Sequence, residues 1–262
     1  MNLDLTCKNA LVCGSTQGLG LASAIELSLL GANITLLARN EDKLKQALGN
    51  LDTTIGQHHA YLVADFSDLD LLFTTINNKI AEGNIYHILI NNTGGPPAGS
   101  ILSADIHAFN VAFSAHVLCN QLLSQAVVPG MKAAGFGRII NIISTTVKEP
   151  IAGLGVSNTI RAAVANWSKT LASELAPFGI TVNNVLPGFH KTGRLDAVLD
   201  SKANQMNISR AEINEQSYKD IPAGRFGEVQ EFGAAVAFLA SPAASYITGI
   251  NLPVDGGRLR CL

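Results

Sequence analysis

The sequence predicts an α/β fold: a single-domain, Rossmann-like, doubly wound parallel β-sheet of about seven strands with helices on both faces. Short apolar runs alternate with stretches of helical apolar spacing along most of the chain. The first apolar run also breaks into glycines and continues as a helix, which is typical of a strand, a tight turn and a helix. Strands joined by helices in this way lie parallel and need right-handed crossovers, which place helices on both faces.

Composition fits one domain and excludes several partners. The 262 residues are 47% apolar and 15% charged, so the core is ample, and we expect a homodimer or homotetramer. A net charge of -2 without a cluster of Lys or Arg predicts no nucleic-acid or anionic-membrane partner. The N-terminus lacks a signal-peptide pattern and no uninterrupted apolar run reaches about 18 residues, so we expect a soluble cytoplasmic protein. Cysteines without paired spacing predict no metal site and no disulfide, only buried free thiols.

The glycine-rich turn after the first strand predicts a phosphate-binding loop. Gly14 lets the chain turn off the strand, while Gly18 and Gly20 allow the backbone and the helix to approach a phosphate. A nucleotide pyrophosphate would bind the free N–H groups at the start of the helix.

The remaining elements follow in alternation. Further strands are predicted at 33–38, 61–64, 87–90, 138–143, 181–186 and 250–254, and helices at 19–30, 41–48, 67–81, 105–134, 156–176 and 229–240. Residues 189–220 are polar and irregular with patches of helical spacing, which predicts a lid or substrate-binding insertion. We find no repeat or linker, so the whole chain, 1–262, is predicted to be one domain.

Six motifs in order resemble the short-chain dehydrogenase/reductase family over nearly the whole chain. They are C-G-S-T-Q-G-L-G at 13–20, N-N-T-G at 91–94, N-I-I-S at 141–144, P-G-F-H-K-T at 187–192, G-R-F-G at 224–227 and V-D-G-G at 254–257. The resemblance implies a nicotinamide cofactor and a small carbonyl or alcohol substrate. The likeness to 3-oxoacyl-acyl-carrier-protein reductases is general to the family and assigns no substrate.

The resemblance also implies which residues hold the cofactor. Arg39 follows the second strand, where relatives that use NAD place an acidic residue, so NADP(H) is favoured over NAD(H) through a bond to its 2′-phosphate. The implied set is Gly14, Ser15, Gln17, Gly18, Leu19, Gly20, Arg39, Asn40, Asp65, Phe66, Asn92, Thr93, Gly94, Arg161, Pro187, Gly188 and Thr192.

The catalytic motif departs from the family. Alignment puts Ser157 where the family has its catalytic Tyr and Arg161 where it has Lys, while His116 falls on the active-site Asn and Ser144 is retained. An aliphatic hydroxyl is a far weaker acid than a phenol, and a guanidinium does not readily pass protons. Arg161 still shares a helix face with Ser157 and can reach the nicotinamide ribose.

Three interpretations stay open. The protein is an oxidoreductase whose proton donor has moved, with His116 the leading candidate because imidazole titrates near neutrality, and His190 and Tyr218 weaker ones. Alternatively it binds NADP(H) as a pseudoenzyme or sensor with little redox chemistry. A non-redox reaction on the same residues is remote, since the nucleophile elbow G-x-S-x-G is missing.

Overall fold

The computed structural model describes residues 1–261, and its core is one seven-stranded parallel sheet with the order β3-β2-β1-β4-β5-β6-β7. The predicted fold class is therefore confirmed. The strands are β1 Asn9–Cys13, β2 Asn33–Ala38, β3 Ala60–Val63, β4 Ile88–Asn91, β5 Gly137–Ile142, β6 Ile180–Pro187 and β7 Asn251–Val254. The order reverses between β1 and β4, and in open α/β sheets ligands bind beyond the carboxyl ends of the strands at such a point.

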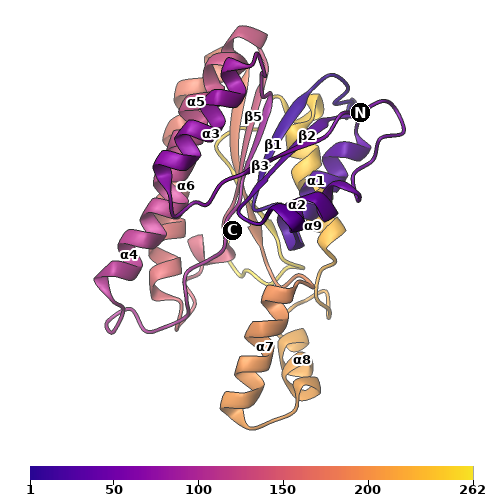
Figure 1. The fold of residues 1–262 in the computed structure, drawn as a ribbon. Coiled ribbons are helices and arrows are strands. Elements are labelled where there is room, and N and C mark those ends of the chain that lie inside the picture. Colours follow the sequence, from indigo (N-terminus) through magenta and orange to yellow (C-terminus); the bar gives the residue numbers. More distant parts are fainter. Residues whose placement is uncertain (262) are drawn as a thin grey trace.

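Helices cover both faces of the sheet (Figure 1). One layer holds α1 Gly18–Leu29, α2 Glu41–Leu48 and α9 Val229–Ala240, and the other holds α3 Leu69–Ala81, α4 Ile106–Phe113, α5 Cys119–Ala134 and α6 Gly155–Leu175. Each layer closes its own apolar core, one centred on Phe232 and Leu27 and the other on Leu123 and Met131. Cys13 and Cys119 are buried as expected, whereas Cys7 and Cys261 are exposed, which corrects the expectation of buried thiols throughout.

A row of amides runs through the sheet from β4 to β7. Asn91 donates to Asn141 over 2.9 Å, Asn141 donates to Asn184 over 2.9 Å, and Asn184 donates to Asn251 over 2.8 Å. The four residues are register partners on adjacent strands. Because a register slip would leave several buried amides unpaired, this row fixes how the two halves of the sheet align.

The predicted helix 105–134 is not continuous. A π-helical turn, Ser114–Leu118, separates α4 from α5 and carries His116, and π-bulges are frequent at functional sites. The stretch Ile106–Ala134 is also apolar enough to cross a membrane by length and composition, with a mean hydropathy of 1.3, which a count of uninterrupted apolar residues misses. In the fold α5 packs its apolar side on α3 and the sheet, so it serves as a core helix.

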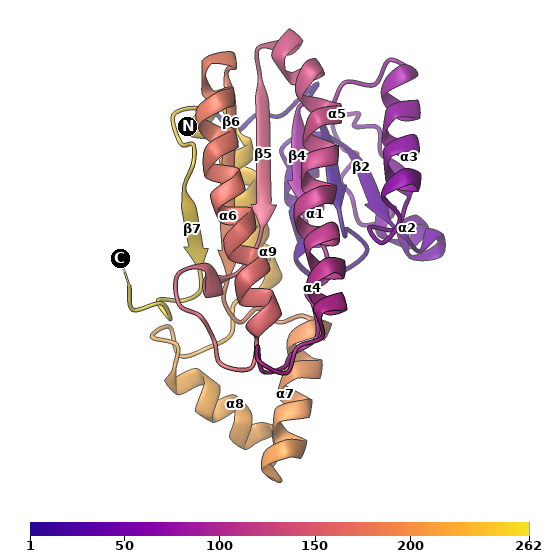
Figure 2. The same cartoon turned by 90° about the vertical axis from the view of Figure 1, so that its left-hand side faces the viewer.

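The segment predicted to be irregular contains two regular helices, α7 Gly193–Met206 and α8 Arg210–Lys219. They extend past the carboxyl ends of the strands, seen at the bottom of Figures 1 and 2. Leu195, Leu199 and Ile213 are buried between them with Phe226. Their caps were the missed signal: Thr192 caps α7, and Ser209 with Glu212 forms a capping box on α8.

Candidate functional site

The glycine-rich turn is built by close backbone contact. Gly14 has a φ of +56°, and a Cβ at Gly20 would lie 2.3 Å from the carbonyl oxygen of Gly14. The side-chain amide of Asn92 donates to that same oxygen over 3.1 Å, which holds the end of β4 against the turn. Only glycine fits at these positions, and the space left beside the turn is bounded by Thr192, whose Cγ2 would lie 3.5 Å from a Cβ at Gly18.

The N-terminus of α1 offers free backbone donors. Its N-cap residue Gln17 makes no side-chain hydrogen bond to the helix, and the first turn carries no acidic residue. Uncapped N–H groups with the positive end of the helix dipole form a site for an anion such as a phosphate. This arrangement fits the nucleotide pyrophosphate that the sequence predicts there.

Two cofactor residues predicted at the strand ends face each other. The Arg39 guanidinium lies 3.7 Å from the Asp65 carboxylate, and the Arg39 side chain is 79% exposed. A backbone hydrogen bond from Ser67, with a smaller contribution from Arg39, lowers the pKa of Asp65. Arg39 is therefore free to meet a further anion at this edge of the sheet.

Several predicted cofactor residues have structural bonds of their own. The buried Ser15 hydroxyl accepts from the Leu37 amide over 3.1 Å, and Asn40 caps α2 through the Lys43 amide over 2.9 Å. The Phe66 ring is buried in the core beside α5. A Cβ at Gly188 would lie 2.6 Å from Asp255, so this glycine lets the V-D-G-G segment approach. Leu19, Thr93, Gly94 and Pro187 lie at the same edge as the glycine-rich turn, at the start of α1 or the ends of β4 and β6.

Three of the predicted catalytic residues, Ser144, Arg161 and His116, lie at the ends of β4 and β5. Arg161, on α6, is buried and donates from Nη1 to the carbonyl oxygen of Ile142 over 2.8 Å. Ser144 follows β5 by two residues and caps a 3-10 turn by accepting from the Thr146 amide over 3.1 Å. Ser157 precedes Arg161 by one helical turn, on the same face of α6.

His116 is not the acid expected from its sequence position. Its side chain is 4% exposed, and burial together with the charge of Arg161 lowers the pKa of His116 to about 3, opposed by a hydrogen bond with the Gly94 backbone. The imidazole is therefore neutral near pH 7. Its nearness to Arg161 and Gly94 places it in the site, but the premise that it titrates near neutrality is wrong.

The two weaker candidates lie in apolar surroundings. His190 is buried, its ring packs edge-on against Phe232 at 5.3 Å between centroids, and burial lowers its pKa. It also occupies the space that a Cβ at Gly227 would need, at 2.8 Å. Tyr218 packs on Phe226 with ring centroids 4.7 Å apart. These ring contacts stabilise the loop after β6 and the helix α8. They do not expose either side chain as a proton donor.

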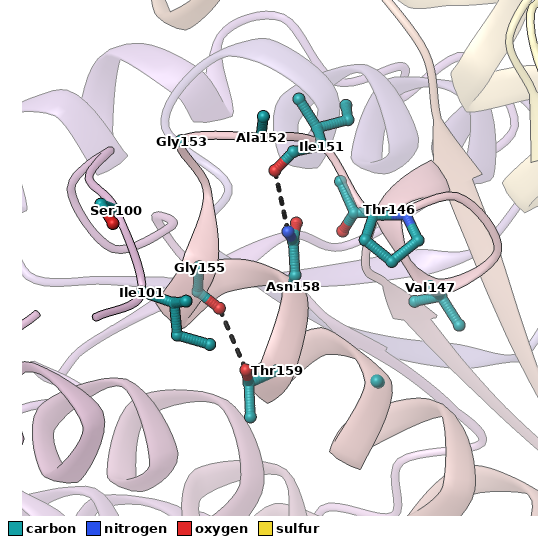
Figure 3. A pocket seen from close by; sticks show the side chains of 12 residues that line it. Ser100, Ile101, Thr146, Val147, Ile151, Ala152, Gly153, Gly155, Asn158 and Thr159 are labelled. Carbon is teal, nitrogen blue, oxygen red and sulfur yellow. Dashed lines mark hydrogen bonds between the residues drawn. The ribbon is translucent and has the colours of Figure 1, made fainter.

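A cavity of about 690 Å³ lies on another side of α6 (Figure 3). Asn158 and Thr159 face it, and their side chains bond to the carbonyl oxygens of Ile151 and Gly155. Ser157 and Arg161 do not line it, because the helical repeat turns them to a different face. Ser100 and Ile101, in the loop that follows β4, contribute to its wall.

Comparison with known proteins gives a consistent result. The family model described as Enoyl-(Acyl carrier protein) reductase matches residues 14–258. The NADPH-dependent reductase BacG of Bacillus subtilis is 30% identical over 256 residues, covering 97% of this chain and 99% of that protein. The 3-oxoacyl-[acyl-carrier-protein] reductase FabG of Salmonella typhimurium is 35% identical over 250 residues, covering 95% and 96%.

A solved structure extends this likeness to three dimensions. The L-sorbose reductase of Gluconobacter frateurii, solved in complex with NADPH and L-sorbose, superimposes with a TM-score of 0.93 at 28% identity over 100% of both chains. The glycine-rich turn, the strand order and these matches lead to one conclusion. The chain belongs to the short-chain dehydrogenase/reductase family.

Proposed function

We propose that this protein is an NADP(H)-dependent oxidoreductase that acts on a carbonyl or alcohol substrate through a non-standard site. The observation that carries the proposal is the uncapped start of α1 behind a turn that only glycine can form. Free N–H donors at this position suit a dinucleotide pyrophosphate. The NADPH dependence of BacG and the NADPH in the L-sorbose reductase complex support the same cofactor.

Arg39 supports NADP(H) over NAD(H). Its exposed guanidinium meets only Asp65, at 3.7 Å, among the acids of the described chain. A 2′-phosphate offers a stronger, bidentate partner than this half-exposed carboxylate. Asp65 then helps to hold Arg39 at the end of β2 rather than bonding a ribose hydroxyl itself.

The residues around Arg161 support charge stabilisation in place of proton donation by a phenol. NADP(H), when bound, supplies or accepts the hydride. In this proposal the Ser144 hydroxyl donates to the substrate oxygen, and the Arg161 cation stabilises negative charge that develops there. His116 stays neutral, so the final proton comes from water in this proposal. A pseudoenzyme that binds NADP(H) remains the alternative.

We further propose that the chain is one domain whose lid is α7 and α8, and that it forms a homodimer or homotetramer. Ile106, Val111 and Leu118 on the long α4–α5 stretch are 73%, 49% and 41% exposed. Exposed apolar side chains on one helical stretch favour a protein interface. Sedimentation that shows only monomer at micromolar concentration would contradict this part of the proposal.

The test of function has a binding step and a chemical step. We would titrate the protein with NADPH and NADH by nicotinamide fluorescence and then measure oxidation of bound NADPH by a panel of ketones. Tighter NADPH binding with oxidation by at least one ketone is expected. Binding without oxidation by any ketone would favour the pseudoenzyme, and no binding of either nucleotide would end the proposal.

A further inference from the structure

We propose that the substrate carries a carboxylate close to its reacting carbon and that Arg161 and Arg194 recognise it. This inference rests on the proposed function, because it assigns a substrate class to the same site. The motivating observation is a buried cation that the chain itself does not neutralise.

The Arg161 guanidinium has more hydrogen-bond donors than partners. Arg161 is 8% exposed, and within residues 1–261 its side chain makes one hydrogen bond, from Nη1 to the Ile142 carbonyl oxygen over 2.8 Å. Its Nε is buried and has no partner in the same residues. A guanidinium has five N–H donors, and leaving buried donors unused is costly. The site is thus short of acceptors.

The same group is also short of negative charge. None of the ion pairs of the described chain includes Arg161. Ser157 cannot ionise near neutral pH, and the neighbouring His116 can only be neutral or positive. A buried charge without an opposite charge is strongly disfavoured. The missing anion must therefore come with a bound molecule.

Arg194 adds a second cation, which is exposed and belongs to no ion pair of residues 1–261. It is the second residue of α7, two positions after Thr192, which borders the glycine-rich turn. The acids nearest to it in sequence are engaged elsewhere, because Asp196 and Asp200 both pair with Arg210. Arg194 lies close enough to Arg161 to lower its pKa further. An anion between the two would relieve their repulsion.

A carboxylate suits this position better than the phosphates of the cofactor do. The 2′-phosphate and pyrophosphate have their own donors at Arg39 and the start of α1, whereas Arg161 lies at the end of β5 beside Ser144. Planar guanidinium groups match carboxylates through two parallel bonds. Gly95 lies beside this group, since a Cβ there would be in ordinary contact with Nη2 of Arg161 at 3.5 Å.

The experiment compares two ketones that differ by one carboxylate, 2-oxohexanoate and 2-hexanone. Their affinities would be measured by thermal stabilisation, with and without saturating NADP+, in the wild type, Arg194→Gln and Lys202→Gln. Lys202 is exposed on the same helix, so its variant matches the loss of charge. We expect the wild type to bind 2-oxohexanoate about tenfold more tightly. Arg194→Gln should remove this preference and leave NADPH affinity unchanged, and Lys202→Gln should alter neither.

Other outcomes separate the two proposals. Equal affinity for both ketones in the wild type would overturn the carboxylate assignment and leave the proposed function intact. Loss of NADPH affinity in Arg194→Gln, with the preference for 2-oxohexanoate retained, would assign Arg194 to the cofactor and likewise overturn it. A preference for 2-oxohexanoate that depends on Arg194 in a wild type that binds no NADPH would support the anion site and reject the oxidoreductase.

Discussion

The two halves of the site differ in what holds them in place. The nucleotide half, around Gly14 and Gly20, is specified by backbone contacts so close that a Cβ would meet a carbonyl oxygen at 2.3 Å. The chemical half, around Ser144 and Arg161, is held by side-chain bonds instead: Ser144 accepts from the Thr146 amide, and Arg161 donates to the carbonyl oxygen of Ile142. An added side chain would therefore displace the backbone in the nucleotide half, whereas a substitution in the chemical half would change only side-chain contacts.

The largest expected effect is that of Gly20→Ala in the glycine-rich turn. The added methyl would meet the Gly14 carbonyl oxygen and the Asn92 amide, which are backbone or fixed groups. Displacing the turn by even part of an ångström should lower NADPH affinity by on the order of 100-fold. Fluorescence titration would measure it. Gly49→Ala is the control, because a Cβ there would have its nearest neighbour at an ordinary 3.4 Å; an equal loss in both variants would refute the turn assignment.

Asn141→Leu tests the row of amides that joins β4 to β7. It removes the central amide of the row and leaves the Asn91 donor and the Asn184 acceptor unpaired inside the sheet. The free energy of unfolding should fall by about 3 kcal/mol. Urea denaturation would show it, with the exposed Asn166→Ala as a control on α6. A change below about 0.5 kcal/mol would mean that the row does not stabilise the register.

Arg39→Asp tests the predicted preference for NADP(H) over NAD(H) at the end of β2. Removing the guanidinium should weaken NADPH binding about tenfold, and the new carboxylate should strengthen NADH binding by accepting from the ribose hydroxyls. Titration with both nucleotides measures the ratio. Lys43→Asp is the control for net charge, because Lys43 is exposed on the adjacent helix α2. Unchanged affinities for both cofactors would remove Arg39 from the site.

His116→Asn tests the burial of His116 in the chemical half through the pH dependence of the unfolding free energy. The folded-state pKa of His116, about 3, is below its ordinary value of 6.5, so protons bind the unfolded chain preferentially between these values. Its contribution to stability is therefore complete above about pH 6.5 and is lost as pH falls toward 3, by about 1 kcal/mol from pH 6 to pH 5. The unfolding free energy of the wild type minus that of the variant should show this slope. A flat difference would mean that His116 is accessible to protons in the folded protein.

Much of the fold could be predicted because its signals are local. Apolar runs and glycine positions located all seven strands to within about a residue or two, as expected for element boundaries. The lid helices were missed because α7 and α8 are polar and lie outside the sheet, so their apolar spacing is sparse while their caps are clear. The π-helical turn at His116 could not be predicted, since it depends on how α4 and α5 pack.

By itself, the sequence determined the family and the parallel sheet, and it predicted the cofactor turn and the catalytic positions of Ser157 and Arg161, because motifs and apolar spacing are properties of the chain. Only the tertiary structure decided how those residues behave. Burial beside Arg161 makes His116 neutral, and the absence of any acid paired with Arg161 among residues 1–261 leaves a cation to be satisfied. Protonation and charge balance depend on neighbours that the fold brings together from distant parts of the chain.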